Sequence, residues 1–397
     1  MDAYSAFRSR DYRLLLGGMF LSNFGMQMLS VAVSWDLYLE TRSALVLGNV
    51  GFVQVAPFLL FALFAGHVAD RYDRRRTMII AQWLLLAASL PLAAGLRSVP
   101  IIYSSLFLVA FARAFQWPAR QSLLPHIVPV EALNNAITWN SSVQEFSSVS
   151  GPAVAGILLA TAGSRTVYIV QLACACLTLV CFFGLRYRSK PMMGAPAPTR
   201  KSLLEGMDFV RKNKLILSAI SLDLFAVLFG GATALLPIYA ADILHAGASG
   251  LGWLRAAPSV GSVTMALVLA HSPKIHRAGV ILLWAVAGFG VATIAFGLSR
   301  SLWFSLAMLV LVGAFDNISV VLRQSLIQTK TPDYVRGRVL AFGSIFISSS
   351  NQFGAVESGW TAAWFGPVVS VAGGGVATIL VVVTCAVISV QLRKWKQ

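Results

Sequence analysis

Long apolar runs, separated at short intervals by charges and by Pro or Gly, constrain this chain more than any other feature. A helix that crosses a bilayer needs about 20 largely apolar residues, and the 397 residues contain enough such runs for twelve helices. They cover 14–38, 44–66, 77–96, 100–121, 134–162, 166–185, 215–240, 250–271, 278–298, 301–323, 339–363 and 367–391. The sequence therefore predicts an all-α polytopic membrane protein.

Composition excludes the soluble classes. The chain is 57% hydrophobic and 12% charged, whereas a soluble domain has about 45–50% apolar and about 25% charged residues. The four cysteines lie in apolar runs without metal-ligand spacing. No Walker, H-E-x-x-H or G-x-S-x-G motif occurs, so we expect no metal, no cofactor and no enzymatic activity.

The net charge of +16 reflects topology rather than a nucleic-acid partner. If the amino terminus is cytoplasmic, most of the 31 basic residues fall on the cytoplasmic side. The opposite side then carries only Arg42, Arg97, Arg165 and Arg300. The positive-inside rule therefore places both termini in the cytoplasm, and we expect a monomer in a bacterial inner membrane.

Segments of the two halves repeat at an offset of 203 residues. Arg120-Gln121-Ser122-Leu123-Leu124 recurs as Arg323-Gln324-Ser325-Leu326-Ile327, and the same offset carries Pro129 onto Pro332 and Gly151 onto Gly354. The repeat predicts two parallel six-helix halves. We predict domains at 1–185 and 215–397, joined by a cytoplasmic linker at 186–214. Its amphipathic end is expected to lie as a helix on the membrane surface.

The loop after the second span carries the most specific motif. Its residues Gly66-His67-Val68-Ala69-Asp70-Arg71-Tyr72-Asp73-Arg74-Arg75-Arg76 resemble the G-x-x-x-D-R-x-G-x-R-R signature of the major facilitator superfamily, with Asp73 at the usual glycine. The resemblance implies a cytoplasmic gate formed by Gly66, Asp70, Arg71, Arg75 and Arg76. A basic loop that only sets topology is the alternative.

Two further motifs and three short segments narrow the resemblance. Arg113-Ala114-Phe115-Gln116 is similar to an intramembrane R-x-x-Q motif, and Gly151-Pro152-Ala153-Val154-Ala155-Gly156 resembles the G-P-x-x-G-G motif of antiporters. The latter implies a helix bend involving Gly151, Pro152 and Gly156. The alternative is an ordinary helix kink that is unrelated to antiport. The segments 7–13, 70–75 and 332–338 resemble the bacterial branch of enterobactin exporters and macrolide efflux pumps.

Charges within the spans point to the site, because a charge at the bilayer centre costs at least about 2.5–3.5 kcal/mol. At about 1.5 Å per residue, Arg113 and Glu145 both lie near mid-membrane, and we predict that they pair. Asp36 and Arg255 share the outer third and are expected to form an outer gate. We assign proton coupling to Glu145, Asp223 and Asp316, although a permanent structural ion pair or a hydrogen-bonded acid is the alternative for each of them.

Polar and aromatic side chains within the spans complete a predicted substrate cavity. Its residues are Arg113, Gln116, Trp117, Gln144, Asn317, Asn351, Gln352 and Glu357, although such polar groups more often bond across helices. The predicted function is export of a small amphiphilic compound, a drug or siderophore-like metabolite, by proton antiport. A lysolipid flippase or nutrient importer is the alternative within this fold, and a passive channel or intramembrane enzyme is the alternative class.

Overall fold

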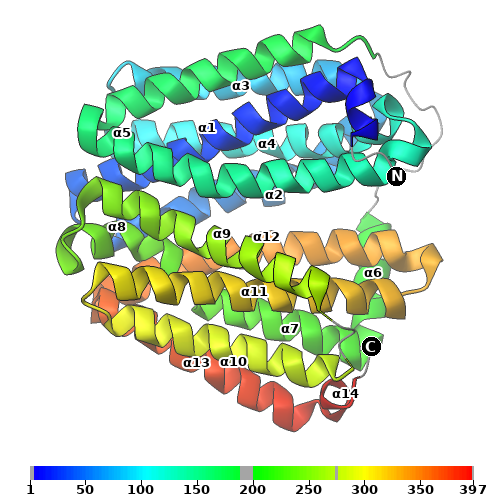
Figure 1. The fold of residues 1–397 in the computed structure, drawn as a ribbon, viewed down its shortest axis with the longest axis vertical. Coiled ribbons are helices and arrows are strands. Elements are labelled where there is room, and N and C mark those ends of the chain that lie inside the picture. Colours follow the sequence, from blue (N-terminus) through cyan, green and yellow to red (C-terminus); the bar gives the residue numbers. More distant parts are fainter. Residues whose placement is uncertain (1–3, 188–199, 273–275, 396–397) are drawn as a thin grey trace. The chain divides into compact units, whose positions relative to one another are not determined.

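The computed structural model describes residues 4–187, 200–272 and 276–395, except for the side chains of 62, 63, 67, 69, 70, 200–204, 333, 334, 341, 342, 344 and 345. Its elements are helical throughout the described residues (Figure 1). The elements are η1 (Ser5–Arg8), α1 (Arg10–Thr41), α2 (Ala44–Arg71), α3 (Arg74–Ala93), α4 (Val99–Ile127), η2 (Val130–Ala132), α5 (Leu133–Gly184), α6 (Arg200–Lys212), α7 (Lys214–Phe229), η3 (Ala232–Leu235), α8 (Leu236–Ile238), η4 (Tyr239–Ile243), α9 (Gly247–His271), α10 (Ala278–Leu298), α11 (Leu302–Lys330), α12 (Asp333–Phe365), α13 (Pro367–Ile388) and α14 (Val390–Arg393).

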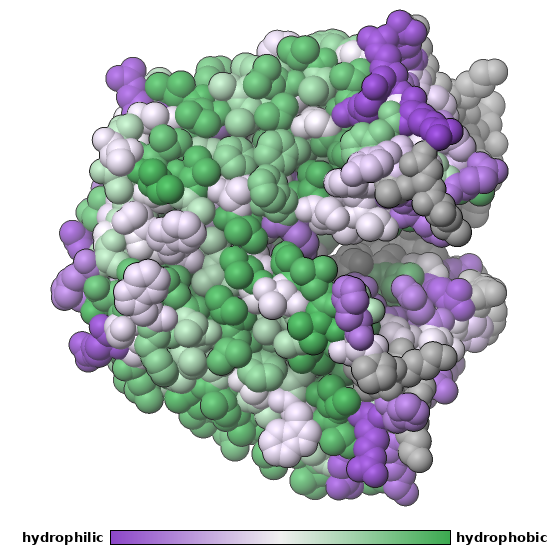
Figure 2. All heavy atoms as spheres, in the orientation of Figure 1, coloured by the Kyte–Doolittle hydropathy of each residue, from purple (hydrophilic) through white to green (hydrophobic). Residues whose placement is uncertain are grey.

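The length and apolarity of the helices confirm an integral membrane fold. Within the described residues, 10 helical segments are long and apolar enough to cross a bilayer. One of them, Val130–Gly184, contains two predicted spans, and the predicted span 339–363 lies within α12. On the face in view, hydrophilic residues gather at the helix ends and hydrophobic residues cover the flanks (Figure 2), as a bilayer requires.

The chain separates into two compact units. Unit 1 comprises Met1–Leu37 and Val53–Thr199, and unit 2 comprises Tyr38–Phe52 and Arg200–Gln397. Unit 1 has a core that includes Leu15, Met78 and Phe182, and unit 2 has one that includes Leu222 and Leu326. The segment Tyr38–Phe52, which comes from the first predicted half, is thus packed within unit 2.

The backbone repeats at the offset that the sequence repeats. Arg42 and His245 are both left-handed, with φ of 48° and 49°, and Gly163 and Gly366 have φ of 77° and 87°. These two glycines each follow a spanning helix, where positive φ lets the chain reverse without a Cβ clash. The 203-residue periodicity is therefore a property of the fold as well as of the sequence.

Helix packing repeats in the same way. A Cβ on Gly151 of α5 would lie 3.1 Å from Phe24 O of α1, and one on Gly354 of α12 would lie 2.8 Å from Val227 O of α7. All four positions obey the 203-residue offset. Small residues let neighbouring membrane helices approach closely, so Gly151 has a packing role. The non-helical backbone angles within α5 are at Gly163, beyond the predicted bend at Gly151-Pro152.

The predicted span over 215–240 is present as the apolar segment Lys214–Ile243, but its helix is interrupted. Helix α7 ends at Phe229, and η3, α8 and the π-helical turn η4 follow the Gly230-Gly231 pair. Two consecutive glycines weaken a helix, and Pro237 cannot donate a backbone hydrogen bond. A Cβ on Gly230 would lie 2.4 Å from Phe289, so close packing also requires glycine at the break.

The predicted amphipathic helix is present as α6, but its apolar face packs on protein. Val210 is 2% exposed and belongs to a cluster with Ile220 and Val339. Helix α6 contacts α7 and α12, and Glu205 forms an ion pair with Arg338. The described part of this apolar face is therefore buried within unit 2 at Val210, whereas residues 188–199 of the predicted linker lie outside the described residues.

Candidate functional site

A buried ion pair joins α7 to α11 within unit 2. Asp223 and Arg323 form the pair, with side chains 5% and 4% exposed. Because almost no water reaches either group, each charge depends on the other for its stabilisation. The sequence pointed to Asp223, whereas Arg323 was only the last residue of the predicted span 301–323. The contact between α7 and α11, which the sequence does not reveal, places Arg323 within the bundle.

Asp316 lies two helical turns before Arg323 on α11, so the two side chains share a helix face. It is within electrostatic range of both Asp223 and Arg323. The Arg323 guanidinium therefore interacts electrostatically with two carboxylates, those of Asp223 and Asp316. The next residue, Asn317, donates to Ser262 Oγ of α9 at 3.0 Å, while its buried Oδ1 has no hydrogen-bond partner among the described residues.

A basic and aromatic face lies along α4 in unit 1. Arg113, Trp117 and Arg120 follow one another at helical spacing, and the Arg120 guanidinium lies 4.6 Å from the Trp117 ring centroid. Trp117 is 50% exposed, and Arg113 is also exposed although it lies at the middle of α4. Charged residues at such depth usually face the bundle interior or a water-filled cavity.

The predicted pairing of Arg113 with Glu145 is wrong. Both residues are described, and no ion pair joins them within the described residues. The depth argument gave their heights but not the directions in which they point. Helix α4 packs chiefly on α3 and touches α5 little, so equal height on consecutive helices does not bring these side chains together.

Two other predicted cavity residues bond across helices. Gln116 is 8% exposed and donates to Gln82 Oε1 of α3 at 2.9 Å. Gln144 accepts from Asn23 Nδ2 of α1 at 2.7 Å. Both therefore take the alternative role that the sequence left open, and the half-buried Glu145 lies next to the α1–α5 seam that Gln144 forms.

The remaining predicted cavity residues lie on α12. Asn351 is exposed and donates to Ile347 O of its own helix. Gln352 lies against α2, where a Cβ on Gly51 would be 2.3 Å from its carbonyl oxygen. Glu357 is half-buried, and its backbone carbonyl accepts from Thr361. These three residues thus remain a proposed lining rather than a formed cluster.

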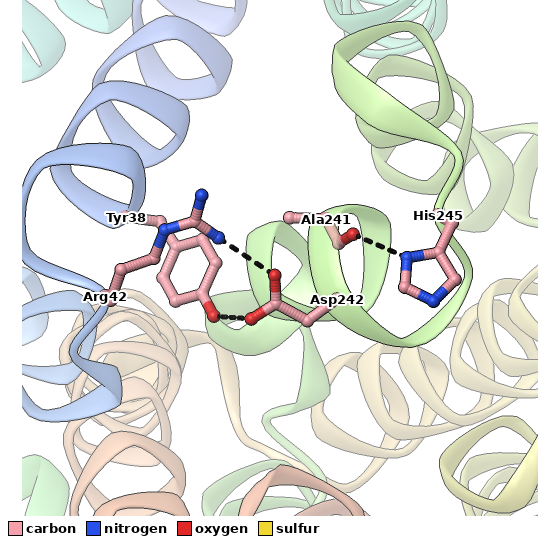
Figure 3. A network of polar contacts seen from close by, with 5 residues as sticks. All are labelled: Tyr38, Arg42, Ala241, Asp242 and His245. Carbon is pink, nitrogen blue, oxygen red and sulfur yellow. Dashed lines mark hydrogen bonds and ion pairs between the residues drawn. The ribbon is translucent and has the colours of Figure 1, made fainter.

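Asp36 of the predicted outer gate has partners within unit 1. Its carboxylate accepts from Tyr168 at 2.9 Å and lies 3.7 Å from Arg97 Nε. The predicted Asp36–Arg255 gate stays a prediction. Unit 2 instead contains a network in which Tyr38 and Arg42 both point at Asp242 (Figure 3). Sequence reasoning missed this network because its residues lie at span ends.

The residues of the loop between α2 and α3 divide into two groups. Asp73 caps α3 by accepting from Arg76 N at 3.1 Å, Arg74 contacts His126, and Arg75 donates to the carbonyls of Phe182 and Phe183. Arg71 and Arg76 are exposed. The Asp70 side chain lies outside the described residues, so the predicted gate of Gly66, Asp70, Arg71, Arg75 and Arg76 stays a prediction.

Comparison with known proteins decides the family. The family model MFS_3, described as "Transmembrane secretion effector", matches residues 1–397. The chain belongs to this family of the major facilitator superfamily. It is 26% identical to the enterobactin exporter EntS of Shigella boydii serotype 4 over 97% of this chain and 93% of that protein. The same identity and coverage relate it to EntS of Escherichia coli O1:K1.

Solved structures agree with the fold. A POT family transporter in complex with a thioalcohol-conjugated peptide has a TM-score of 0.77 at 10% identity, covering 97% of both chains. The nucleoside transporter NupG has a TM-score of 0.72 at 13% identity, covering 95% of this chain and 99% of that one. This major facilitator protein is therefore a secondary transporter that exports a small molecule, and not an enzyme.

Proposed function

We propose that this transporter exports a siderophore-like or drug-like amphiphile in exchange for protons, with both termini in the cytoplasm. The buried Asp223–Arg323 pair, with Asp316 two turns away on α11, carries the proposal. Asp223 is buried and Asp316 is half-buried, and ionising both acids beside one cation carries an electrostatic cost. Such a cluster is suited to hold a proton and to release it when its surroundings change.

Coupling in this proposal is an exchange of partners around Arg323. Protonation of Asp223 removes the charge that holds Arg323, and the guanidinium then pairs with Asp316 on the same helix face. The two arrangements give α7 and α11 two discrete contacts, as a bistable element requires. Because α7 ends at the Gly230-Gly231 break, it can shift without moving η4. Glu145 is the second proposed proton carrier, in unit 1.

The substrate in this proposal carries aromatic rings and anionic or acceptor oxygens. The α4 face supplies two guanidinium groups and an exposed indole ring, which suit such a molecule through ion pairing and stacking. Asn317 Oδ1 and Ser349 Oγ, which have no hydrogen-bond partner in the part of the chain that the structure describes, add polar positions on α11 and α12. Similarity to enterobactin exporters supports a siderophore-like compound over a purely apolar one.

Transport in proteoliposomes tests this proposal. The purified protein is reconstituted, and uptake of enterobactin is measured with the lumen made acidic or left at the outside pH. We expect the gradient to accelerate uptake, because protons leave as substrate enters. Asp223→Asn and Asp316→Asn should abolish that acceleration while leaving downhill flux.

Asp208→Asn is the matched control, since it removes one carboxylate from the exposed α6, where Asp208 pairs with Lys212. It should keep the full response to the gradient. Full acceleration in both Asp223→Asn and Asp316→Asn would contradict the proposed coupling site. Equal substrate uptake with and without the pH gradient in the unmodified protein would contradict proton exchange itself.

A further inference from the structure

A groove lies among α2, α3 and α4 within unit 1, and its lining includes two residues of the predicted cytoplasmic gate, Arg71 and Arg76. Its volume is about 720 Å³, which is in the range of sites that hold small molecules. Its walls are apolar over most of their length, and they include Val68, Ile80, Leu84, Phe111 and Phe115. A wall of this kind suits hydrocarbon rather than a water-soluble ligand.

One end of the groove is basic. Arg71, the last residue of α2, and Arg76, in the first turn of α3, both line it and are exposed. Asp73 also lines this end, but its carboxylate accepts from the backbone of Arg76 as the cap of α3. The two guanidinium groups are therefore available for an anion, and Arg is well suited to bind phosphate with two parallel hydrogen bonds.

The groove matches the depth of one leaflet. From Arg76 to Leu84 the helix rises about 12 Å at 1.5 Å per residue, and half of the hydrocarbon core is about 15 Å. The basic end lies on the loop that the positive-inside rule assigns to the cytoplasm. A molecule held by both ends would thus have its charge at the headgroup level and its apolar part among the acyl chains.

We propose that this groove binds a phospholipid with an anionic headgroup from the cytoplasmic leaflet. The phosphate lies between Arg71 and Arg76, and an acyl chain follows Ile80, Leu84 and Phe115. Basic sites between membrane helices on the cytoplasmic side suit such headgroups, and each basic residue strengthens binding about fivefold. Free phosphate would leave the apolar wall uncovered, so the lipid is the better fit to the whole groove.

Native mass spectrometry tests the proposal with the full chain in detergent. The protein is titrated with phosphatidylglycerol or phosphatidylcholine, and the bound lipid is counted. We expect a preference for phosphatidylglycerol, which Arg71→Gln/Arg76→Gln should weaken by about 30-fold. Arg71→Lys/Arg76→Lys, which keeps both charges, should retain most of the binding and shows that the fold tolerates substitution at these positions.

Arg10→Gln/Arg13→Gln is the matched control, since both residues are exposed near the start of α1 and the charge change is identical. This control variant should keep the preference for phosphatidylglycerol over phosphatidylcholine. Equal loss in the two glutamine variants would overturn the site in favour of a diffuse basic surface. Leu84→Trp should fill the apolar part of the groove and weaken the binding of both lipids. Undiminished binding would also overturn the proposal. Displacement of the lipid by millimolar glycerol phosphate would do the same.

Discussion

Loss of either partner should show how strongly each charge of the buried Asp223–Arg323 pair depends on the other. The two side chains are 5% and 4% exposed, so water cannot replace a missing partner. Removing one member of such a pair typically costs about 3–5 kcal/mol. We therefore expect Asp223→Asn and Arg323→Gln each to lower the free energy of unfolding by about that amount. Arg323→Gln should be the more severe, because Asp223 and Asp316 then face each other without a cation.

A double-mutant cycle in mixed detergent micelles measures this coupling. Unfolding by sodium dodecyl sulfate gives the free energy of each variant, and the double variant should be no less stable than Arg323→Gln alone. The pair of Lys212 with Asp208 is the control, since its side chains are 76% and 59% exposed, and its cycle should give about 0–1 kcal/mol. Additive effects at Asp223 and Arg323 would refute the argument from burial.

Three smaller perturbations test the packing of a glycine, the cap of α3 and an exposed ion pair. Gly151→Val should destabilise the protein by about 1–3 kcal/mol, since a Cβ there would lie 2.6 Å from that of Gln27; Gly17→Val, with nothing within 4 Å, should have little effect in the same unfolding assay. Asp73→Ala should cost about 1 kcal/mol through the lost cap, while Asp73→Ser should not. Asp242→Asn should change the free energy of unfolding by less than about 1 kcal/mol, because the Asp242 side chain is 45% exposed. A larger change in the same assay would contradict this prediction.

Sequence reasoning predicted the helices well because each span can be recognised from the apolar composition of its own residues. The division of α5 between two predicted spans falls at Gly163, where the sequence placed a turn. The repeat also carried real structural information, since Gly163 and Gly366 share a left-handed backbone. These features depend on residues that are near in sequence or related by one fixed offset, so a single chain reveals them.

Contacts between helices were much harder to predict. Hydropathy gives the height of Arg113 and Glu145 but not the rotation of their helices, and the predicted pair does not form. Arg323 ends the predicted span 301–323 and was expected near its cytoplasmic end, yet its side chain is only 4% exposed. Gln116 was expected to face a cavity but bonds to Gln82. Each error concerns which helix face meets which neighbour, and that is decided by tertiary packing.

Proton movement driven by substrate alone tests the central claim most directly. Proteoliposomes carrying a pH-sensitive dye inside are given enterobactin outside, with no initial pH gradient and with the membrane potential clamped at zero. Exchange predicts that the lumen becomes more alkaline as substrate enters, and that Asp223→Asn and Asp316→Asn abolish this change. Substrate entry at the normal rate with no change in luminal pH would contradict the account.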